Sequence, residues 1–266
     1  MKFSIVTPVT YNRKLKEAEE RMPRYKMFQK TISSVKAQSF KDFEWIIVDD
    51  MCDPPVKLKN PYVRIIRLPE KSGRLVARNT GMKAAQGEWI CWLDGDDEYS
   101  SMYLEAINEA IAAYPEYKVF NFNHLVYSHD YVTTIRKFIN MEIQKDLPFP
   151  SGTVGAGSYV FHRSVMEDIG FMPELGLWDF TAKVMEEFPE VKPFYESKEQ
   201  PGKYHSPGNP WGEDWYYFYR ITRKYPSKYL NSALYHVHSR WGHTWPGDPK
   251  HVEEPGKEPQ WDPNNQ

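Results

Sequence analysis

The chain has 266 residues, and its 34 Lys and Arg against 36 Asp and Glu give a formal net charge of −2 at pH 7. This length allows a large α/β domain with a sizeable core, and the near-neutral charge gives no indication of a nucleic-acid or acidic-membrane partner. The two cysteines, Cys52 and Cys91, are far apart and lack CxxC spacing, which argues against a disulfide framework or a structural zinc site.

Short apolar runs alternate with helical periodicity in the first half of the chain. The runs predict strands at 3–7, 43–48, 63–68, 89–93 and 118–123, and the periodicity predicts helices at 26–38, 74–86 and 100–113. This β-α-β order is typical of a largely parallel sheet that helices cover on both faces.

The second half has a less regular pattern. It predicts strands at 131–139, 153–162 and 229–238, and helices at 163–169, 179–188 and 213–224. No clean linker divides the two halves, so we expect a single domain over 1–240. Within it, 1–124 would be the nucleotide-binding half and 125–240 the acceptor half, and 241–266 would be an extended tail.

An acidic segment, Asp94-Gly95-Asp96-Asp97-Glu98, directly follows the apolar run at 89–93. Carboxylates thus emerge where a buried strand ends, which is where open α/β sheets bind ligands. Hard oxygen ligands hold Mg²⁺ or Mn²⁺, and these ions usually arrive with a phosphorylated substrate. The alternatives are a simple acidic turn and a calcium loop, but Tyr99 occupies the position where a calcium-binding EF-hand loop needs glycine.

Several short motifs carry a family resemblance. In chain order they are Thr7-Pro8, Tyr11-Asn12-Arg13, Thr31-Ile32-Ser33-Ser34-Val35 with Gln38-Ser39-Phe40, Ile47-Val48-Asp49-Asp50, Ala77-Arg78-Asn79-Thr80-Gly81, Gly87-Glu88-Trp89-Ile90 and Leu93-Asp94-Gly95-Asp96-Asp97. Together they resemble the N-terminal half of a family 2 glycosyltransferase with the GT-A fold. The resemblance implies a Rossmann-like α/β fold with a mostly parallel central sheet, helices on both faces and a smaller acceptor-side sheet. It also implies inverting, metal-dependent transfer from a nucleoside diphosphate sugar, with a UDP-sugar expected, by an enzyme of the hexosyltransferase type.

The resemblance implies nucleotide contacts for Pro8, Tyr11, Asp50, Arg74, Arg78, Asp94, Gly95 and Arg240. Asp50, at a strand end, can accept a hydrogen bond from a base N–H, or it can cap a helix. The ring of Tyr11 can stack on a base or simply pack. Guanidinium groups of Arg74 and Arg78 suit phosphate oxygens, although either could be a solvated helix charge.

For the metal, the resemblance implies Mn²⁺ or Mg²⁺ held by Asp96 and His238. His236 and His238 alternate along a predicted strand and therefore point the same way. Beside them, Arg240 would reach the phosphates. A lone histidine is usually structural, so both interpretations stay open.

Asp214 matches the position of the catalytic base, which would take the proton from the acceptor hydroxyl. It begins an aromatic helix, where a carboxylate can also act as a cap. Glu213 is the competing candidate for the base. Two other classes remain open: a sugar nucleotidyltransferase and a non-catalytic nucleotide-sugar or carbohydrate-binding protein. A sugar nucleotidyltransferase usually has a glycine-rich loop after strand one, which this chain lacks.

The acceptor cannot be read from the sequence; a glycan, a lipid-linked acceptor or another hydroxyl would each fit. No apolar run approaches the roughly 18 residues of a membrane span, so we expect a cytoplasmic protein without a transmembrane segment. The basic stretch 13–30 would allow peripheral contact with a membrane, although such runs are more often solvated faces.

Overall fold

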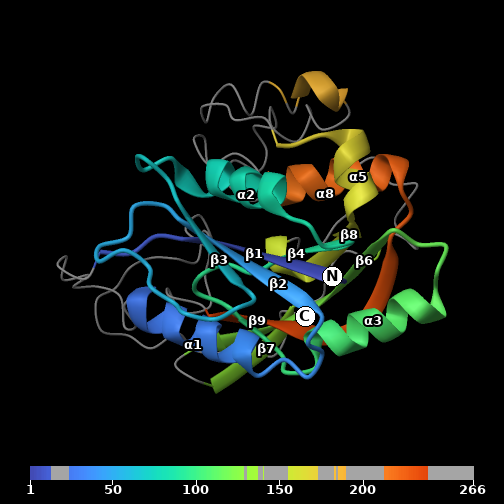
Figure 1. The fold of residues 1–266 in the computed structure, drawn as a ribbon. Helices are drawn as coiled ribbons and strands as arrows, with labels where there is room; N and C mark the ends of the chain where they lie inside the picture. Colours follow the sequence, from blue (N-terminus) through green and yellow to red (C-terminus); the bar gives the residue numbers. More distant parts are fainter. Residues whose placement is uncertain are drawn as a thin grey trace, which may run out of the picture.

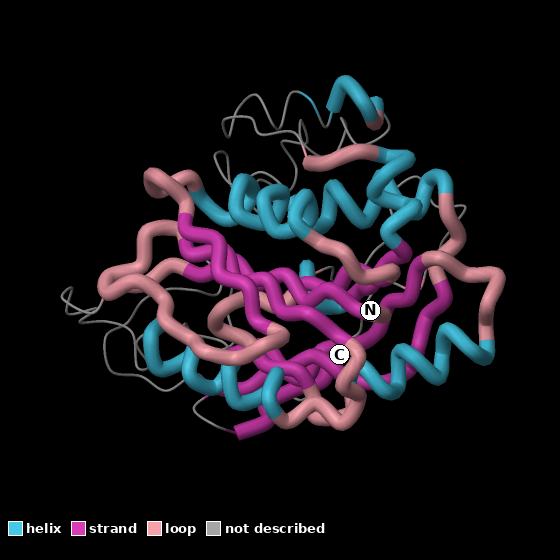
Figure 2. The backbone as a smooth tube through the Cα atoms, viewed as in Figure 1, coloured by secondary structure: helices cyan, strands magenta, loops and turns pink. Residues whose placement is uncertain are grey.

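The computed structural model describes residues 1–12, 24–128, 131–136, 140, 155–172, 183, 185–189 and 213–238. Within these ranges the side chains of 128, 131–134, 136 and 213–215 are not described. The described elements form one nine-stranded sheet between two layers of helices (Figures 1 and 2).

Parallel strands form one half of the sheet, in the order β3-β2-β1-β4. The chain moves outward from β1 to β3 and then returns to β4 on the other side of β1. The strands are β1 (Phe3–Val9), β2 (Phe43–Asp49), β3 (Val63–Arg67) and β4 (Trp89–Trp92). The sheet therefore has a switch point between β1 and β4, at their carboxyl ends.

Mixed pairing continues the sheet beyond β4. Antiparallel β8 pairs with both β4 and β6, β9 runs parallel to β6, and β5 and β7 pair antiparallel with β9 and β6 respectively. These strands are β5 (Glu98–Tyr99), β6 (Val119–Ser128), β7 (Tyr131–Arg136), β8 (Tyr159–His162) and β9 (Lys228–His238). The strands expected to form a smaller acceptor-side sheet are thus hydrogen-bonded into the central sheet, and β6 crosses the boundary expected at residue 124.

Two apolar cores lie on opposite faces of the sheet (Figure 1). α1 (Arg24–Lys36) and α3 (Tyr103–Ala113) cover one face, and α2 (Gly73–Ala84), α5 (Arg163–Ile169) and α8 (Glu213–Lys224) cover the other. Alternate residues of each strand serve the two cores: Ile5 faces the first core and Val6 the second. This arrangement confirms the expected sheet with helices on both faces.

The predicted strands and helices of the first half are confirmed, with small shifts at their ends. The two-residue strand β5 was not predicted. The strand expected at 153–162 begins only at Tyr159, because Ala156–Ser158 form a short 3-10 helix, η1. The tail at 241–266 and most of the helix expected at 179–188 lie outside the described residues. None of the helices in the described part of the chain has the length and apolar character needed to cross a membrane.

Candidate nucleotide and metal site

The acidic loop lies against β1 at the switch point. A Cβ atom on Gly95 would lie 3.0 Å from Val9 Cγ2 and 3.1 Å from the Pro8 carbonyl oxygen, which leaves little room for a larger residue. Two of the predicted nucleotide-contact residues, Pro8 and Gly95, are therefore neighbours in space. Ligands of open α/β sheets bind at this place, outside the carboxyl ends of the strands.

Three carboxylates converge in this loop. One oxygen from each of Asp94, Asp96 and Asp97 lies within 4.8 Å of the others, and Asp94 and Asp96 are partly exposed while Asp97 is buried. Burial, and after it the charge of Asp94, raises the pKa of Asp97 to about 8. Hard carboxylate oxygens gathered in this way are a suitable donor set for Mg²⁺ or Mn²⁺.

Arg78 reaches this cluster from α2. Its Nη2 lies 2.7 Å from Asp94 Oδ1, its guanidinium lies 5.3 Å from the centre of the Trp92 ring, and the residue is buried. This burial argues against the alternative that Arg78 is a solvated helix charge. Arg74, in the first turn of the same helix, is exposed. Direct phosphate contacts for the two arginines remain predictions.

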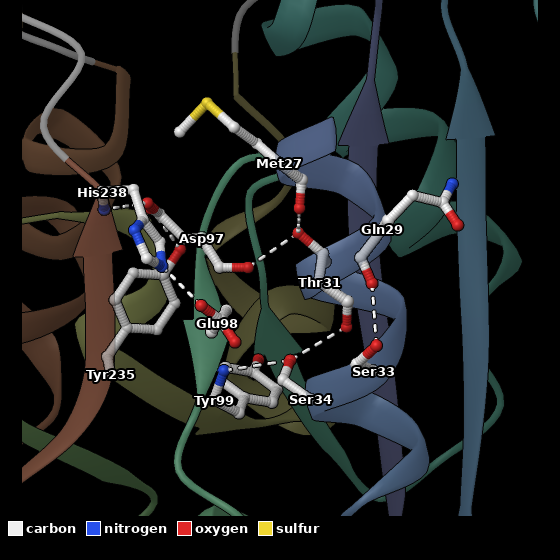
Figure 3. A network of polar contacts seen from close by, with 10 residues as sticks. All are labelled: Met27, Gln29, Thr31, Ser33, Ser34, Asp97, Glu98, Tyr99, Tyr235 and His238. Carbon is white, nitrogen blue, oxygen red and sulfur yellow. Dashed lines mark hydrogen bonds and ion pairs between the residues drawn. The ribbon is translucent and has the colours of Figure 1, made fainter. Parts of the chain in front are cut away.

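Strand β9 fixes the far side of the acidic loop (Figure 3). The Tyr235 hydroxyl accepts from the Asp94 backbone N–H at 3.1 Å and donates to Asp97 Oδ2 at 2.8 Å. The backbone N–H of His238 donates to Asp97 Oδ1 at 3.0 Å. Tyr235 was not among the predicted site residues; the signal in the sequence is a tyrosine within a predicted strand, whose hydroxyl needs a partner when buried.

The two histidines of β9 point the same way, as predicted, and the ring of Tyr127 lies 5.3 Å from His236 and 5.2 Å from His238. Nε2 of His238 lies 2.5 Å from Glu98 Oε1, and this hydrogen bond is the largest cause that lowers the pKa of Glu98. His238 is thus next to the acidic loop but engaged with Glu98, so its role as a metal ligand remains a prediction.

Polar residues on one face of α1 hold the chain on either side of β5 (Figure 3). Thr31 Oγ1 donates to the carbonyl oxygen of Asp97 at 2.7 Å, and Ser34 Oγ accepts from the Tyr99 N–H at 3.2 Å. Just beyond the end of α1, the side-chain amide of Gln38 forms hydrogen bonds with the backbone at the start of α3. The acidic loop is therefore fixed from two elements that are far apart in sequence.

Asp50 binds the start of α2. Its two carboxylate oxygens accept from the backbone N–H groups of Ser72 and Gly73, at 2.7 and 3.1 Å, and the residue is 3% exposed. This is the helix-capping role that the sequence left as the alternative to a base contact. The neighbouring Asp49 accepts from Arg67 Nη1 at 2.8 Å and is structural.

Tyr11 is also more enclosed than expected. It is 7% exposed, and its ring lies 5.3 Å from that of Tyr25 and 6.1 Å from that of Phe28. The packing alternative therefore describes its observed contacts, and a stacking role on a base remains a prediction.

The first turn of α8 carries Glu213 and Asp214, which are described by their backbone alone. One turn further, the ring of Tyr217 lies 5.4 Å from that of Trp92, at the carboxyl end of β4. The start of α8 is thus anchored close to the strand that leads into the acidic loop. Arg240 lies outside the described residues.

A parallel sheet with an acidic loop at its switch point places the chain in the class of α/β nucleotide-binding folds. The family model "Glycosyl transferase family 2" matches residues 4–170, more than half of the chain. The chain belongs to glycosyltransferase family 2.

Curated relatives match over limited lengths. The uncharacterized glycosyltransferase YwdF of Bacillus subtilis is 32% identical over 115 residues, 42% of this chain and 38% of that protein. The poly(ribitol-phosphate) beta-N-acetylglucosaminyltransferase TarP of Staphylococcus aureus is 35% identical over 103 residues, 34% of this chain and 32% of that protein. The chain thus spans about a third of the length of these relatives.

Solved structures confirm the fold. The crystal structure of S. aureus TarS in complex with UDP has a TM-score of 0.57 and 16% identity, and the match covers 90% of this chain and 61% of that one. A further TarS structure, in complex with UDP-GlcNAc, gives a TM-score of 0.53 at 17% identity over 91% of this chain and 60% of that one. Likeness at this identity supports the fold class alone.

Proposed function

We propose that this protein is a metal-dependent inverting glycosyltransferase that moves a sugar from a UDP-sugar to an acceptor hydroxyl. The observation that carries the proposal is the convergence of Asp94, Asp96 and Asp97 within 4.8 Å at the sheet's switch point. Membership of glycosyltransferase family 2 supports the reaction class. The UDP and UDP-GlcNAc complexes of TarS support a uridine nucleotide as donor.

The donor set fits a divalent cation. Asp96 is the first ligand we propose, with Asp94 and Asp97 completing the cluster, because all three offer hard oxygens within one ion's reach. Bound Mn²⁺ or Mg²⁺ would neutralise the negative charge that develops on the leaving diphosphate. His238 would join this shell only if its Nε2 left Glu98.

The protein's own residues would orient the donor and move one proton. Arg78 holds the Asp94 carboxylate by a 2.7 Å contact, and the lack of a side chain at Gly95 lets the acidic loop lie close against β1. Asp214 would accept the proton of the acceptor hydroxyl as the hydroxyl attacks the face opposite the leaving group. Such attack inverts the anomeric centre, and base assistance contributes about 10²–10⁴-fold in rate.

We propose a glycan or polyol-phosphate polymer as the acceptor. This follows relatives such as TarP and the putative teichuronic acid biosynthesis glycosyltransferase TuaG of Bacillus subtilis, which is 37% identical over 82 residues. A cytoplasmic location, with peripheral membrane contact through residues 13–30, remains part of the proposal.

A panel of UDP-sugars tests the proposal by UDP release, with Mn²⁺ and with chelator. We expect metal-dependent turnover with at least one donor, and Asp214→Asn should lower that turnover about 10²–10⁴-fold at unchanged UDP affinity. Glu213→Gln is the control at the adjacent position and should remain active. If Glu213→Gln is the inactive variant, the two roles are exchanged; UDP binding without turnover of any donor would contradict the enzyme assignment.

A further inference from the structure

The Tyr235 hydroxyl lies between the two ends of the acidic loop. It accepts from the backbone N–H of Asp94 and donates to the side chain of Asp97, across sequence separations of 141 and 138 residues. Within the loop itself, the Asp97 N–H donates to the Asp94 carbonyl oxygen at 3.1 Å. One side-chain oxygen therefore contacts both ends of the turn that carries the carboxylates.

The ring that presents this hydroxyl is held rigidly. Tyr235 is 1% exposed, and its ring lies 5.8 Å from that of Tyr99 and 5.3 Å from that of His124. On another side it touches Gly157 of η1, where an added Cβ would lie only 1.7 Å from Tyr235 Cε2. Because the ring has so little freedom, its hydroxyl can determine where the loop sits.

The turn needs such support because its carboxylates repel one another. Carboxylate oxygens of three acidic side chains lie within 4.8 Å of one another, and like charges at this distance disfavour the compact arrangement. A hydrogen bond from Tyr235 to Asp97 and another from the Asp94 N–H stabilise it. Partners of this kind, which orient metal ligands without touching the metal, typically change metal affinity 10–100-fold when they are removed.

We infer that Tyr235 is a positioning residue: its hydroxyl fixes the Asp94–Asp97 turn in the conformation that binds a divalent cation together with a nucleoside diphosphate. This inference rests on the proposed function of the site. Tyr235 lies behind the loop and acts on the ligand through Asp94 and Asp97.

Strand β9 offers a matched control. Tyr229 also donates its hydroxyl to a partner on the neighbouring strand, Asn123 Oδ1, at 2.7 Å, and it is remote from the acidic loop in the strand. Tyr235→Phe removes the hydrogen bonds of its hydroxyl to Asp94 and Asp97, and Tyr229→Phe removes the bond to Asn123; both variants keep the ring. A general loss of stability would affect both variants, whereas a positioning role belongs to Tyr235 alone.

The test is Mn²⁺ and UDP binding by calorimetry, combined with hydrogen exchange at residues 94–97 in the ligand-free protein. We expect Tyr235→Phe to weaken Mn²⁺–UDP binding about 10–100-fold and to speed exchange of the Asp94 amide, with Tyr229→Phe within about twofold of wild type in both. Equal Mn²⁺–UDP affinity in Tyr235→Phe and wild type would overturn the inference.

The exchange measurement separates this inference from the proposed function. If the wild-type protein does not bind Mn²⁺–UDP, the proposed function fails, and the amides of residues 94–97 still decide whether the hydroxyl fixes the turn. Faster exchange in Tyr235→Phe alone would support the positioning role. Unchanged exchange, or equal acceleration in Tyr229→Phe, would contradict it.

Discussion

The two ends of the parallel strands both bury carboxylates, in opposite electrostatic settings. At the amino end, Glu44 is 8% exposed and its Oε1 accepts from Ser4 Oγ and from the Gln86 N–H, each at 2.6 Å. Its other oxygen lies 3.8 Å from Arg64 Nη2, and Ser4 Oγ in turn accepts from the Gly87 N–H. Donors surround this carboxylate, as is typical of a structural buried acid.

At the carboxyl end, negative charges gather. The pKa of Asp97 is raised first by burial and then by the charge of Asp94. Hydrogen bonds from the His238 N–H and the Tyr235 hydroxyl, and after them the charge of Arg78, oppose this rise. A cluster whose mutual repulsion is not fully compensated is suited to a cation that arrives with its ligand. Because Glu44 and Asp97 are buried to the same degree, the difference between them lies in their local charge balance.

Substitution of one glycine at each end of the parallel strands tests this comparison. A Cβ on Gly87 would lie 2.6 Å from the Phe3 carbonyl carbon and 2.7 Å from Ser4 N, so Gly87→Ala should cost about 3 kcal/mol of unfolding free energy and leave UDP affinity unchanged. Gly95→Ala meets Val9 Cγ2 at 3.0 Å, so it should cost only about 1 kcal/mol. Denaturant unfolding and UDP titration of both variants test this.

Displacement of the loop should nevertheless weaken UDP binding in Gly95→Ala. If Gly87→Ala lowers UDP affinity as much as Gly95→Ala does, the two ends are not functionally separate.

Removal of the structural carboxylate gives a second contrast. Glu44→Ala leaves the Ser4 hydroxyl and the Gln86 N–H without their acceptor, so it should lower the unfolding free energy by about 1–3 kcal/mol. Asp96→Asn, at the charged end, should change stability by less than about 0.5 kcal/mol or raise it, since it removes repulsion. Urea unfolding at pH 7 in chelator measures both, and the reverse ranking would contradict the comparison.

The pH dependence of stability gives a third contrast. Asp97 has a folded pKa of about 8 against an ordinary value of 3.8, so between these values the folded state keeps a proton that the unfolded state has lost. The unfolding free energy of the metal-free protein should therefore fall as pH rises from about 4 to 8, by at most about 1.4 kcal/mol per unit from this group. Denaturant unfolding across this range measures the slope.

Asp97→Asn is the control for that slope and should flatten it. A slope of the same size in Asp97→Asn would assign the effect to other groups.

Local patterns predicted most of the fold. Apolar runs located β1 to β4, and the acids after Leu93 located the loop, because strand burial and a polar strand end are properties of neighbouring residues. The contacts that organise the loop were not predictable in this way. Tyr235 and Thr31 reach Asp97 from 138 and 66 residues away in sequence, and periodicity carries no information on such pairings.

Because local patterns carry no information on contacts between distant residues, some site residues have contacts that differ from expectation. A carboxylate at a strand end can bind a ligand or cap the next helix, and only the position of Ser72 and Gly73 shows that Asp50 caps α2. Its contact with a base remains a prediction. The guanidinium of Arg78 lies against the Trp92 ring and contacts Asp94, an arrangement that no local pattern encodes.

The most direct test of the account is calorimetric titration of UDP into the wild-type protein and Asp96→Asn, each with Mn²⁺ and with chelator, with circular dichroism to verify folding. The account predicts that Mn²⁺ tightens UDP binding to the wild type about a hundredfold or more, since a bound ion contributes several kcal/mol and 1.4 kcal/mol is tenfold. It predicts that folded Asp96→Asn loses most of this difference. Equal UDP affinity with and without Mn²⁺ in the wild type would contradict it.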